Sequence, residues 1–343
     1  MLNALRGSKV KGWSGPLKMA AYEAAFRLFC RHRQGTKPNI LLHCTRRTGS
    51  TWLMNTVCAH PGMRSEGRPF MTALYTRHRK HIPDLAKAAG YTGNHKFACM
   101  VHFEGEDEQR FRAFAKSVVS GRTVVYPMLR FWEPYFQRVT DRVIYQMTTT
   151  TAMAEWFSDN FNCQNVVLLR HPITSSLSTM AAGWQVHCWD FLYHRWFVEN
   201  YLTGEQVDLS RRIMESGSTI EQHVLDWTLK MLVPIRALAS GRHPDWLVVT
   251  YERIVREPEA VLQELSRQLD LPDIEAMRSQ VKLPSRTVSK TSSDKVDDPD
   301  YILNRWRKKI DAEQERQLMG ILEAFEIDTY RVGDAEPHLM ARS

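Results

Sequence analysis

The apolar and polar positions along the chain predict short buried strands separated by longer helices. Continuous apolar runs typical of strands covered on both faces occur at residues 39–44, 165–169 and 246–251. Helical spacing occurs at residues 51–58, 151–162, 220–239, 258–269 and 311–325. Strands that alternate with helices favour a parallel sheet joined by crossovers. We therefore expect one α/β domain over residues 38–330, preceded by an arm (1–37) and followed by a tail (331–343).

The composition is that of a globular protein, since 43% of the 343 residues are hydrophobic and 24% are charged. No apolar run reaches the length of about 18 residues that a membrane-spanning helix needs. The six cysteines are scattered without the spacing of a zinc site, which is typical of buried thiols in a reducing compartment. With no apolar leader segment near Met1, we expect a cytoplasmic location.

The positive charge is concentrated in the arm. Of the net charge of +8, residues 1–37 carry +7, from eight Lys or Arg and one Glu, so the remainder is close to neutral. This distribution argues against broad nucleic-acid binding. Residues 17–32 predict a helix with apolar residues on one side and basic flanks. It either packs on the edge of the domain or makes a peripheral contact with an acidic membrane surface.

The first candidate motif follows the first predicted strand and comprises Thr45, Arg46, Arg47, Thr48, Gly49, Ser50, Thr51 and Trp52. A strand–loop–helix junction presents unpaired backbone N–H groups and the positive end of the helix dipole. Gly49 lets an anion approach the backbone, and the two arginines add positive charge. The motif predicts a phosphate or sulfate cradle; the alternative is an ordinary capped helix start. It is not a Walker A loop, because position 45 is not glycine.

The second candidate motif lies where the strand at 165–169 runs into Arg170, His171 and Pro172. An arginine at the carboxyl end of such a strand faces the crevice in which α/β sheets bind ligands. Ser178 lies about two helical turns further on, where its hydroxyl can supplement a clamp on a second phosphate. The alternative is an arginine paired with a nearby carboxylate.

Together the two motifs resemble those of the sulfotransferases that use 3′-phosphoadenosine-5′-phosphosulfate (PAPS). In that family a loop similar to Arg47-Thr48-Gly49-Ser50-Thr51-Trp52 holds the 5′-phosphosulfate, and a strand ending in Arg-x-Pro with a serine eight residues later holds the 3′-phosphate. Residues 249–252, followed by Glu257 and Pro258, resemble a third family segment, although Arg253 departs from its usual Asp. The arginine at position 47 is closer to the carbohydrate and bacterial branches than to the cytosolic phenol branch.

The resemblance implies a fold like that of the P-loop NTPases, with a central parallel sheet, PAPS as co-substrate and no metal. It assigns Arg46, Arg47, Thr48, Gly49, Ser50, Thr51 and Trp52 to the phosphosulfate, and Arg170 and Ser178 to the 3′-phosphate. Arg47 would neutralise charge on the leaving phosphate oxygen. The polar segment 284–300, with Arg286, Lys290 and Lys295, is the candidate substitute for a basic C-terminal signature that the chain lacks.

An acceptor hydroxyl also needs a base, for which the sequence offers three candidates. Glu66 lies just past the first helix, in the region that supplies a base in the carbohydrate and bacterial branches. His102 is the second candidate, because the phenol branch uses a histidine in about that part of the chain. Glu104 is the third. Each of them is equally compatible with a surface or cap residue.

The expected function is transfer of a sulfuryl group from PAPS to a hydroxyl or amine, with a carbohydrate or glycolipid as the expected acceptor. One alternative is a variant nucleotide kinase, but Arg170 has the wrong charge for the Mg²⁺ ligand that a kinase needs at a strand end. The other is a non-enzymatic module that binds nucleotide or membrane through the basic arm. The oligomeric state is left open.

Overall fold

The computed structural model describes residues 21, 24–26, 28–125, 135–281 and 298–338. Its centre is a five-stranded parallel sheet, which confirms the predicted fold class. Across the sheet the strands follow the order β3 (Met63–Glu66), β5 (Arg142–Gln146), β2 (Asn39–Cys44), β6 (Cys163–Leu169) and β7 (Leu247–Thr250). The three predicted apolar runs are β2, β6 and β7. A separate two-stranded parallel sheet pairs β1 (Arg31–His32) with β4 (Val139–Thr140).

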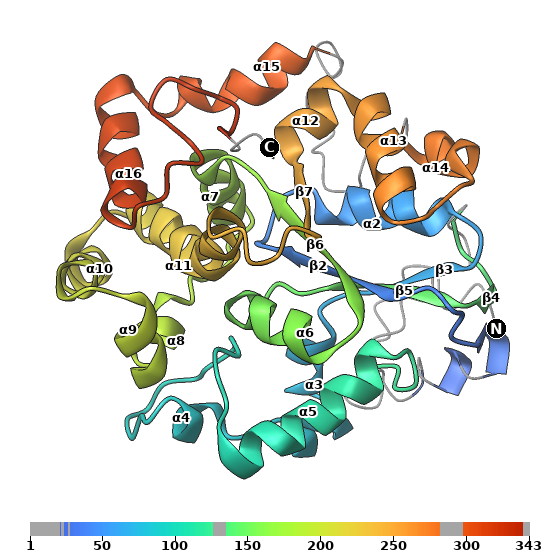
Figure 1. The fold of residues 1–343 in the computed structure, drawn as a ribbon. Coiled ribbons are helices and arrows are strands. Elements are labelled where there is room, and N and C mark those ends of the chain that lie inside the picture. Colours follow the sequence, from blue (N-terminus) through green and yellow to red (C-terminus); the bar gives the residue numbers. More distant parts are fainter. Residues whose placement is uncertain (1–20, 22–23, 27, 126–134, 282–297, 339–343) are drawn as a thin grey trace.

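Helices cover both faces of the sheet (Figure 1). The α-helices are α2 (Ser50–Ala59), α3 (Pro69–Ala73), α4 (Leu85–Ala88), α5 (Gly105–Val119), α6 (Ala154–Asn160), α7 (Pro172–Ala181), α8 (Cys188–Leu192), α9 (Arg195–Tyr201), α10 (Gly204–Ser216), α11 (Thr219–Ala239), α12 (Tyr251–Arg256), α13 (Pro258–Gln268), α14 (Ile274–Val281), α15 (Pro299–Asn304) and α16 (Ala312–Ala324). Short 3₁₀ helices occur at η2 (Arg77–His81), η3 (Thr151–Met153) and η4 (Arg305–Lys308). The helix predicted over 151–162 is therefore divided between η3 and α6.

Because side chains alternate along a strand, neighbouring residues of β2 pack against helices on opposite faces of the sheet. Ile40 and Leu42 of β2 pack in one cluster with α2, α13 and α14. Leu41, between them, points to the other face and joins the cluster of α3, α5 and α6. Figure 1 shows the first group above the sheet and the second below it. All of β2 is buried, as the continuous apolar run predicts.

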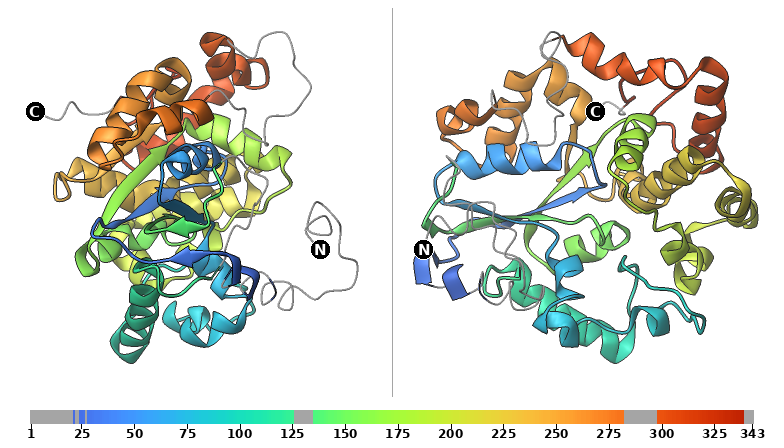
Figure 2. Two further views of the ribbon diagram at one scale, coloured as in Figure 1. Left: turned by 90° about the vertical axis from the view of Figure 1, so that its right-hand side faces the viewer. Right: turned by 180° about the vertical axis from the view of Figure 1, so that it is seen from behind.

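The parallel arrangement places the functional loops together. Because all five strands run in one direction, their carboxyl ends share one edge of the sheet, where α/β proteins bind ligands. The loop 45–49 follows β2, α7 follows β6 and α12 follows β7 at this edge. Figure 2 shows α2 and α7 from two further sides. Both predicted anion motifs therefore lie on adjacent strands.

Several predicted segments lie outside the described residues. These are residues 1–20 of the basic arm, all but the last three residues of the polar segment 284–300, and residues 339–343 of the tail. The predicted helix 17–32 is described in part; it is helical at residues 24–26 and 28–29 and gives way to β1 at Arg31.

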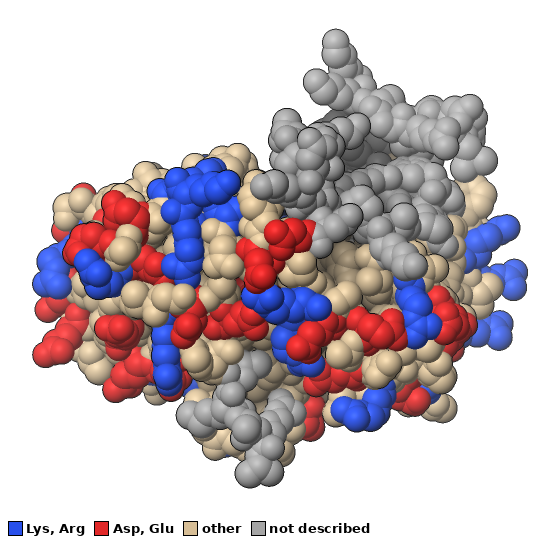
Figure 3. All heavy atoms as spheres, turned by 90° about the horizontal axis from the view of Figure 1, so that it is seen from above, with Lys and Arg blue, Asp and Glu red and all other residues tan. Residues whose placement is uncertain are grey.

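No helix among the described residues combines the length and the apolar character needed to cross a bilayer. On the face drawn in Figure 3, the basic and acidic side chains of the described residues are interspersed.

Candidate active site

The loop after β2 has the backbone geometry of an anion cradle. Arg47 and Gly49 both have a positive φ, of 65° and 91°. The hydroxyl of Thr48 donates to the carbonyl of Thr45 at 3.0 Å and closes the turn. A left-handed conformation is costly for a non-glycine residue, so its presence at Arg47 marks a loop that the surroundings hold in a special shape.

The start of α2 leaves its first N–H groups for a ligand. Among the described residues no side chain caps this helix start, and the first turn carries no acidic residue. A Cβ at position 49 would lie 2.9 Å from Cδ2 of Tyr251, so only glycine fits there without movement. The helix dipole and the uncapped N–H groups suit a phosphate or sulfate. Gln146 donates to the Ser50 hydroxyl at 2.7 Å and orients it.

The two predicted motifs form one cluster of positive charge. Nε of Arg47 donates to Oγ of Ser178 at 2.9 Å. Nη1 of Arg170 donates to the carbonyl oxygen of Arg47 at 2.5 Å. Ser175, also on α7, donates to the carbonyl oxygen of Arg46 at 2.9 Å. Strand β6 and helix α7 therefore hold the loop in place, and the side chains predicted for the two phosphates are adjacent.

The guanidinium of Arg170 is buried and, within the described residues, has a free hydrogen-bond donor, which suits an anion. The residue is 7% exposed, and its guanidinium lies 4.0 Å from the ring centroid of Tyr251. Its Nε is buried without a hydrogen-bond partner among the described residues. Burial lowers the pKa of Arg170, but an arginine stays protonated at any physiological pH. A buried cation with an unused donor fits a phosphate group.

A buried carboxyl group, that of Glu252, holds the backbone of the residue that follows Arg170. Oε1 of Glu252 accepts the backbone N–H of His171 at 2.8 Å, and Oε2 accepts the hydroxyl of Tyr330 at 3.2 Å. Burial raises the pKa of Glu252 to about 7, against the opposing effects of these hydrogen bonds and of Arg170. The residue is 2% exposed, and each of its carboxyl oxygens accepts one of these hydrogen bonds.

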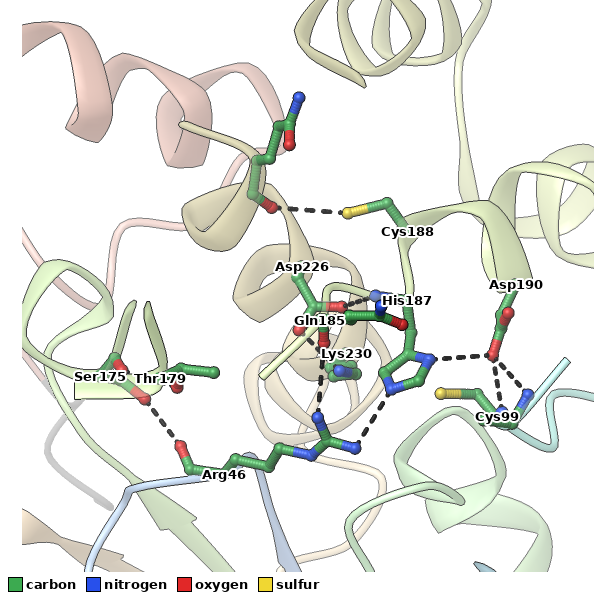
Figure 4. A network of polar contacts seen from close by, with 12 residues as sticks. Arg46, Cys99, Ser175, Thr179, Gln185, His187, Cys188, Asp190, Asp226 and Lys230 are labelled. Atoms are coloured by element: carbon green, nitrogen blue, oxygen red, sulfur yellow. Dashed lines mark hydrogen bonds and ion pairs between the residues drawn. The ribbon is translucent and has the colours of Figure 1, made fainter. Parts of the chain in front are cut away.

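Arg46 extends toward the segment between α7 and α8. Its Nη2 donates to Nε2 of His187 at 3.1 Å, and its Nη1 lies 3.4 Å from the carbonyl oxygen of Gln185. Its guanidinium is 5.3 Å from the ring centroid of Trp184, which is 38% exposed. Figure 4 shows Arg46 reaching from the loop to His187, with Asp190 on the far side of the imidazole.

The predicted residue Trp52 faces a different part of the molecule. Its indole nitrogen lies 3.4 Å from the carbonyl oxygen of Val281, and the ring packs on the core formed by α2, α13 and α14. Thr51, in the first turn of α2, is half-buried, and Ser50 is buried. These two residues stand at the cradle, whereas the contacts of Trp52 are those of a packing residue.

Glu66 is fully buried in an ion pair. Its Oε1 accepts from Nη1 of Arg64 at 2.5 Å, and its Oε2 accepts the backbone N–H of Val125 at 3.2 Å. Glu66 pairs with Tyr145 of β5, which pairs with Leu41 of β2. Glu66 is therefore two strands away from β2, level with a residue three positions before the last residue of β2. Strand spacing and rise place its Cα atom about 14 Å from that of Cys44.

His102 and Glu104, the other predicted bases, contact one another at 3.3 Å between Nε2 and Oε1. The imidazole of His102 stacks on Trp196 with ring centroids 3.8 Å apart, and burial lowers its pKa. Glu104 is 76% exposed in its side chain. Within the described part of the chain, neither side chain makes a hydrogen bond to the loop 45–49.

One group of described residues brings metal-ligating atoms within 4.8 Å of one another: Cys99, His187 and Asp190. Burial raises the pKa of Cys99 well above its usual value, so the thiol keeps its proton. The carboxylate of Asp190 accepts the backbone N–H groups of Ala98 and Cys99 at 2.9 and 2.7 Å. The Asp190 carboxylate is thus engaged by backbone N–H groups, and we propose no metal there.

The fold is a parallel α/β domain in which the loop after β2 and the end of β6 bring Arg47, Arg170 and Ser178 together. The model of the sulfotransferase family matches residues 38–276. The chain belongs to the sulfotransferase family, whose enzymes take a sulfuryl group from PAPS.

Solved structures of sulfotransferases resemble the chain at low sequence identity. The sulfotransferase domain of the Synechococcus PCC 7002 olefin synthase is 17% identical, with a TM-score of 0.40, over 87% of this chain and 97% of that one. Sulfotransferase STF9 from Mycobacterium avium is 14% identical, with a TM-score of 0.41, over 93% and 83%. Mouse SULT7A1, complexed with PAP, is 10% identical, with a TM-score of 0.37, over 85% and 86%. No curated protein sequence matches the chain.

Sequence reasoning did not assign several residues that the structure brings to the site. Tyr251 stacks on Arg170, and Ser175 holds the loop. Trp184 and His187 contact Arg46. For Trp184 and His187 the available signal was their position directly after the second motif, because a segment that follows a strand end at the ligand-binding edge returns across that edge of the sheet.

Proposed function

We propose that this sulfotransferase transfers the sulfuryl group of PAPS to a hydroxyl group of a carbohydrate or glycolipid. The observation that carries the donor assignment is the cluster of Arg47, Ser178 and Arg170, because it joins a phosphate-binding helix start to a second, buried anion site. A donor with phosphate groups at both the 5′ and 3′ positions uses both halves of such a cluster.

The 5′-phosphosulfate would bind at the uncapped start of α2. The N–H groups of Gly49, Ser50 and Thr51 are available there, and no acidic side chain in the first turn opposes an anion. Arg47 stands beside this site and would neutralise the charge that grows on the phosphate oxygen as the bond to sulfur breaks.

The 3′-phosphate would bind Arg170 and Ser178. The buried guanidinium offers an unused Nε donor, and the serine hydroxyl lies at the same edge. This second contact would select PAPS over ATP and over nucleotides without a 3′-phosphate. Positioning and charge account for most of the catalysis in transfers of this type.

The acceptor assignment is supported by Trp184. Its ring is 38% exposed and lies beside the guanidinium groups of Arg46 and Arg47, at 5.3 and 5.9 Å. An exposed indole face next to the reaction centre suits the apolar face of a sugar ring. Phenolic acceptors would use the same face and are the competing class.

The experiment tests the donor by PAP binding and the acceptor by sulfate transfer. Calorimetric titration with PAP, without magnesium, should show binding that collapses in Arg47→Ala and Arg170→Ala and that AMP and ATP do not reproduce. Transfer of ³⁵S from PAPS should then favour glycosides and glycolipids over phenols. Magnesium-dependent ATP binding in place of PAP binding would contradict the donor assignment, and preferred sulfation of phenols would contradict the acceptor class.

A further inference from the structure

The segment 184–187 and the loop 45–49 face one another across the carboxyl edge of the sheet. Arg46 contacts Trp184, Gln185 and His187, so the segment borders the space next to the phosphosulfate cradle. The side chain of His187 is 17% exposed, which leaves the imidazole open to this space. An acceptor that approaches the cradle from solvent would meet this histidine.

The contacts of His187 determine which ring nitrogen carries the proton. A guanidinium only donates hydrogen bonds, so Nε2, which lies 3.1 Å from Nη2 of Arg46, must be the acceptor nitrogen. The proton of the neutral ring is then on Nδ1, which lies 3.7 Å from Oδ2 of Asp190. The lone pair of Nε2 is therefore directed toward the loop.

Asp190 is fixed in its position behind the ring. It is fully buried, and it accepts hydrogen bonds from the backbone N–H groups of Ala98 and Cys99. Nε2 of His95 lies 2.7 Å from its other oxygen. At 3.7 Å from Nδ1, this carboxylate is beyond hydrogen-bond distance of the neutral ring, but its charge stabilises the imidazolium that forms when the ring takes up a proton.

The backbone of His187 is held by a second buried carboxylate. Oδ1 of Asp226 on α11 accepts the N–H of His187 at 2.6 Å, and Oδ2 pairs with Lys230 at 2.6 Å. Burial lowers the pKa of His187 to about 4, with a further lowering from Lys230 and Arg46 and an opposing effect of Asp226 and Asp190. The ring is thus neutral at physiological pH, as a base must be.

We propose that His187 is the base that removes the proton from the acceptor hydroxyl, with the charge of Asp190 stabilising the imidazolium and Asp226 as the positioning residue. This inference rests on the proposed function. The acceptor oxygen forms a bond to sulfur while the bond from sulfur to the 5′-phosphate oxygen breaks. PAP leaves with that electron pair, and the hydroxyl proton passes to Nε2 and from there to solvent.

Donor binding would make Nε2 available. In the free protein Arg46 occupies this nitrogen, but a guanidinium bonds a phosphate or sulfate more strongly than a neutral imidazole, because both partners are then charged. The anionic donor therefore draws Arg46 away from His187 and opens the lone pair to the acceptor. Glu66 and His102 have no corresponding contact with the loop in the described residues.

The first test observes the histidine directly in the full chain. Nitrogen NMR of ¹⁵N-histidine-labelled protein, with His187 assigned from its absence in His187→Ala, should show an unprotonated Nε2 whose signal shifts when PAP is added. A protonated Nε2, or no response to PAP in a protein that binds PAP by calorimetry, would overturn the inference alone. Absence of PAP binding in the wild type would instead contradict the proposed function.

The second test follows release of ³⁵S-sulfate from PAPS, with water as the acceptor. His187→Ala should lower this rate by about 10²-fold or more, the contribution typical of a general base, while PAP affinity stays within about twofold. Added imidazole should restore part of the rate, which it would not do for a structural defect. His60→Gln, at the opposite end of α2, is the matched control. An unaffected rate in His187→Ala, or an equal loss in His102→Ala, would overturn the assignment.

Discussion

Nε of Arg47 donates a 2.9 Å hydrogen bond to Oγ of Ser178, and this contact joins two motifs 131 residues apart in the chain. Arg170 completes the connection through the carbonyl oxygen of Arg47. The phosphate loop and the second anion site are therefore parts of one structure, and a change in either should affect the other.

Ser178→Ala should weaken PAP binding by about tenfold or more. The substitution removes a hydroxyl that contacts a guanidinium, and hydrogen bonds to charged groups contribute about 1.5–3 kcal/mol. Calorimetric titration with PAP measures the change, with Thr174→Ala on the same helix as the control. Equal affinities of Ser178→Ala and the wild type would show that the hydroxyl does not contribute to the donor site.

Arg170→Ala should abolish the preference for a 3′-phosphate. We expect PAP affinity to fall by about 100-fold, because a buried charge-assisted contact is lost, while the weaker affinity for AMP changes little. The ratio of the two dissociation constants is the readout, and it does not depend on the amount of folded protein. Arg253→Ala is the control, since its guanidinium pairs with Glu264 of α13. A preserved ratio would place the 3′-phosphate elsewhere.

Gly49→Ala should lower both stability and PAP affinity. A left-handed φ costs a non-glycine residue about 1–2 kcal/mol, and the new Cβ would also meet Tyr251 at 2.9 Å. Gly241→Ala is the matched control. Its φ of +67° is also left-handed, so alanine has a backbone cost there too, but nothing lies within 4 Å of the new Cβ. Denaturant unfolding should show the larger loss for Gly49→Ala, and PAP binding should suffer in that variant alone.

Glu252 should make the free energy of unfolding depend on pH. Its pKa is raised from 4.5 to about 7 in the folded protein, so the folded state binds the proton more tightly than the unfolded state does. The stabilisation from this proton is complete below about pH 4.5 and is lost as the pH rises through about 7.

Glu252→Gln removes this titration. The difference in unfolding free energy between the variant and the wild type should change by about 3 kcal/mol across that pH window. Denaturant unfolding at several pH values checks it, with the exposed Glu323→Gln as the control. A difference that is independent of pH would contradict the raised pKa.

Glu66→Gln should destabilise the fold by about 3 kcal/mol, because it leaves the buried guanidinium of Arg64 without its counter-charge. If Glu66 is structural, the turnover per folded molecule should stay within a few-fold of the wild type. A selective loss of turnover at unchanged stability would instead restore Glu66 as the acceptor base. Thermal unfolding and sulfate transfer, measured on the same samples, separate the two outcomes.

Local sequence was enough to predict the main strands and to place the two candidate anion motifs at strand ends. The continuous apolar run at 39–44 is β2 residue for residue, because a strand buried on both faces needs an apolar side chain at nearly every position. Arg47, Gly49 and Arg170 were predicted from their place at strand ends, since a parallel sheet brings all such ends to one edge. Strand β3 was not predicted, because its sequence Met-Arg-Ser-Glu is too polar to read as a buried strand.

Local sequence could not identify the base that removes the proton from the acceptor. Glu66, His102 and Glu104 were the candidates in sequence, and only three-dimensional packing distinguishes a carboxylate paired with Arg64 from the imidazole of His187, which faces the loop. The contacts that orient His187 come from residues 98–99, 190 and 226, which are brought together by α8, α11 and the segment before α5. Strand ends follow from local hydrophobic pattern, whereas the tautomer and direction of one histidine depend on long-range contacts that no local pattern encodes.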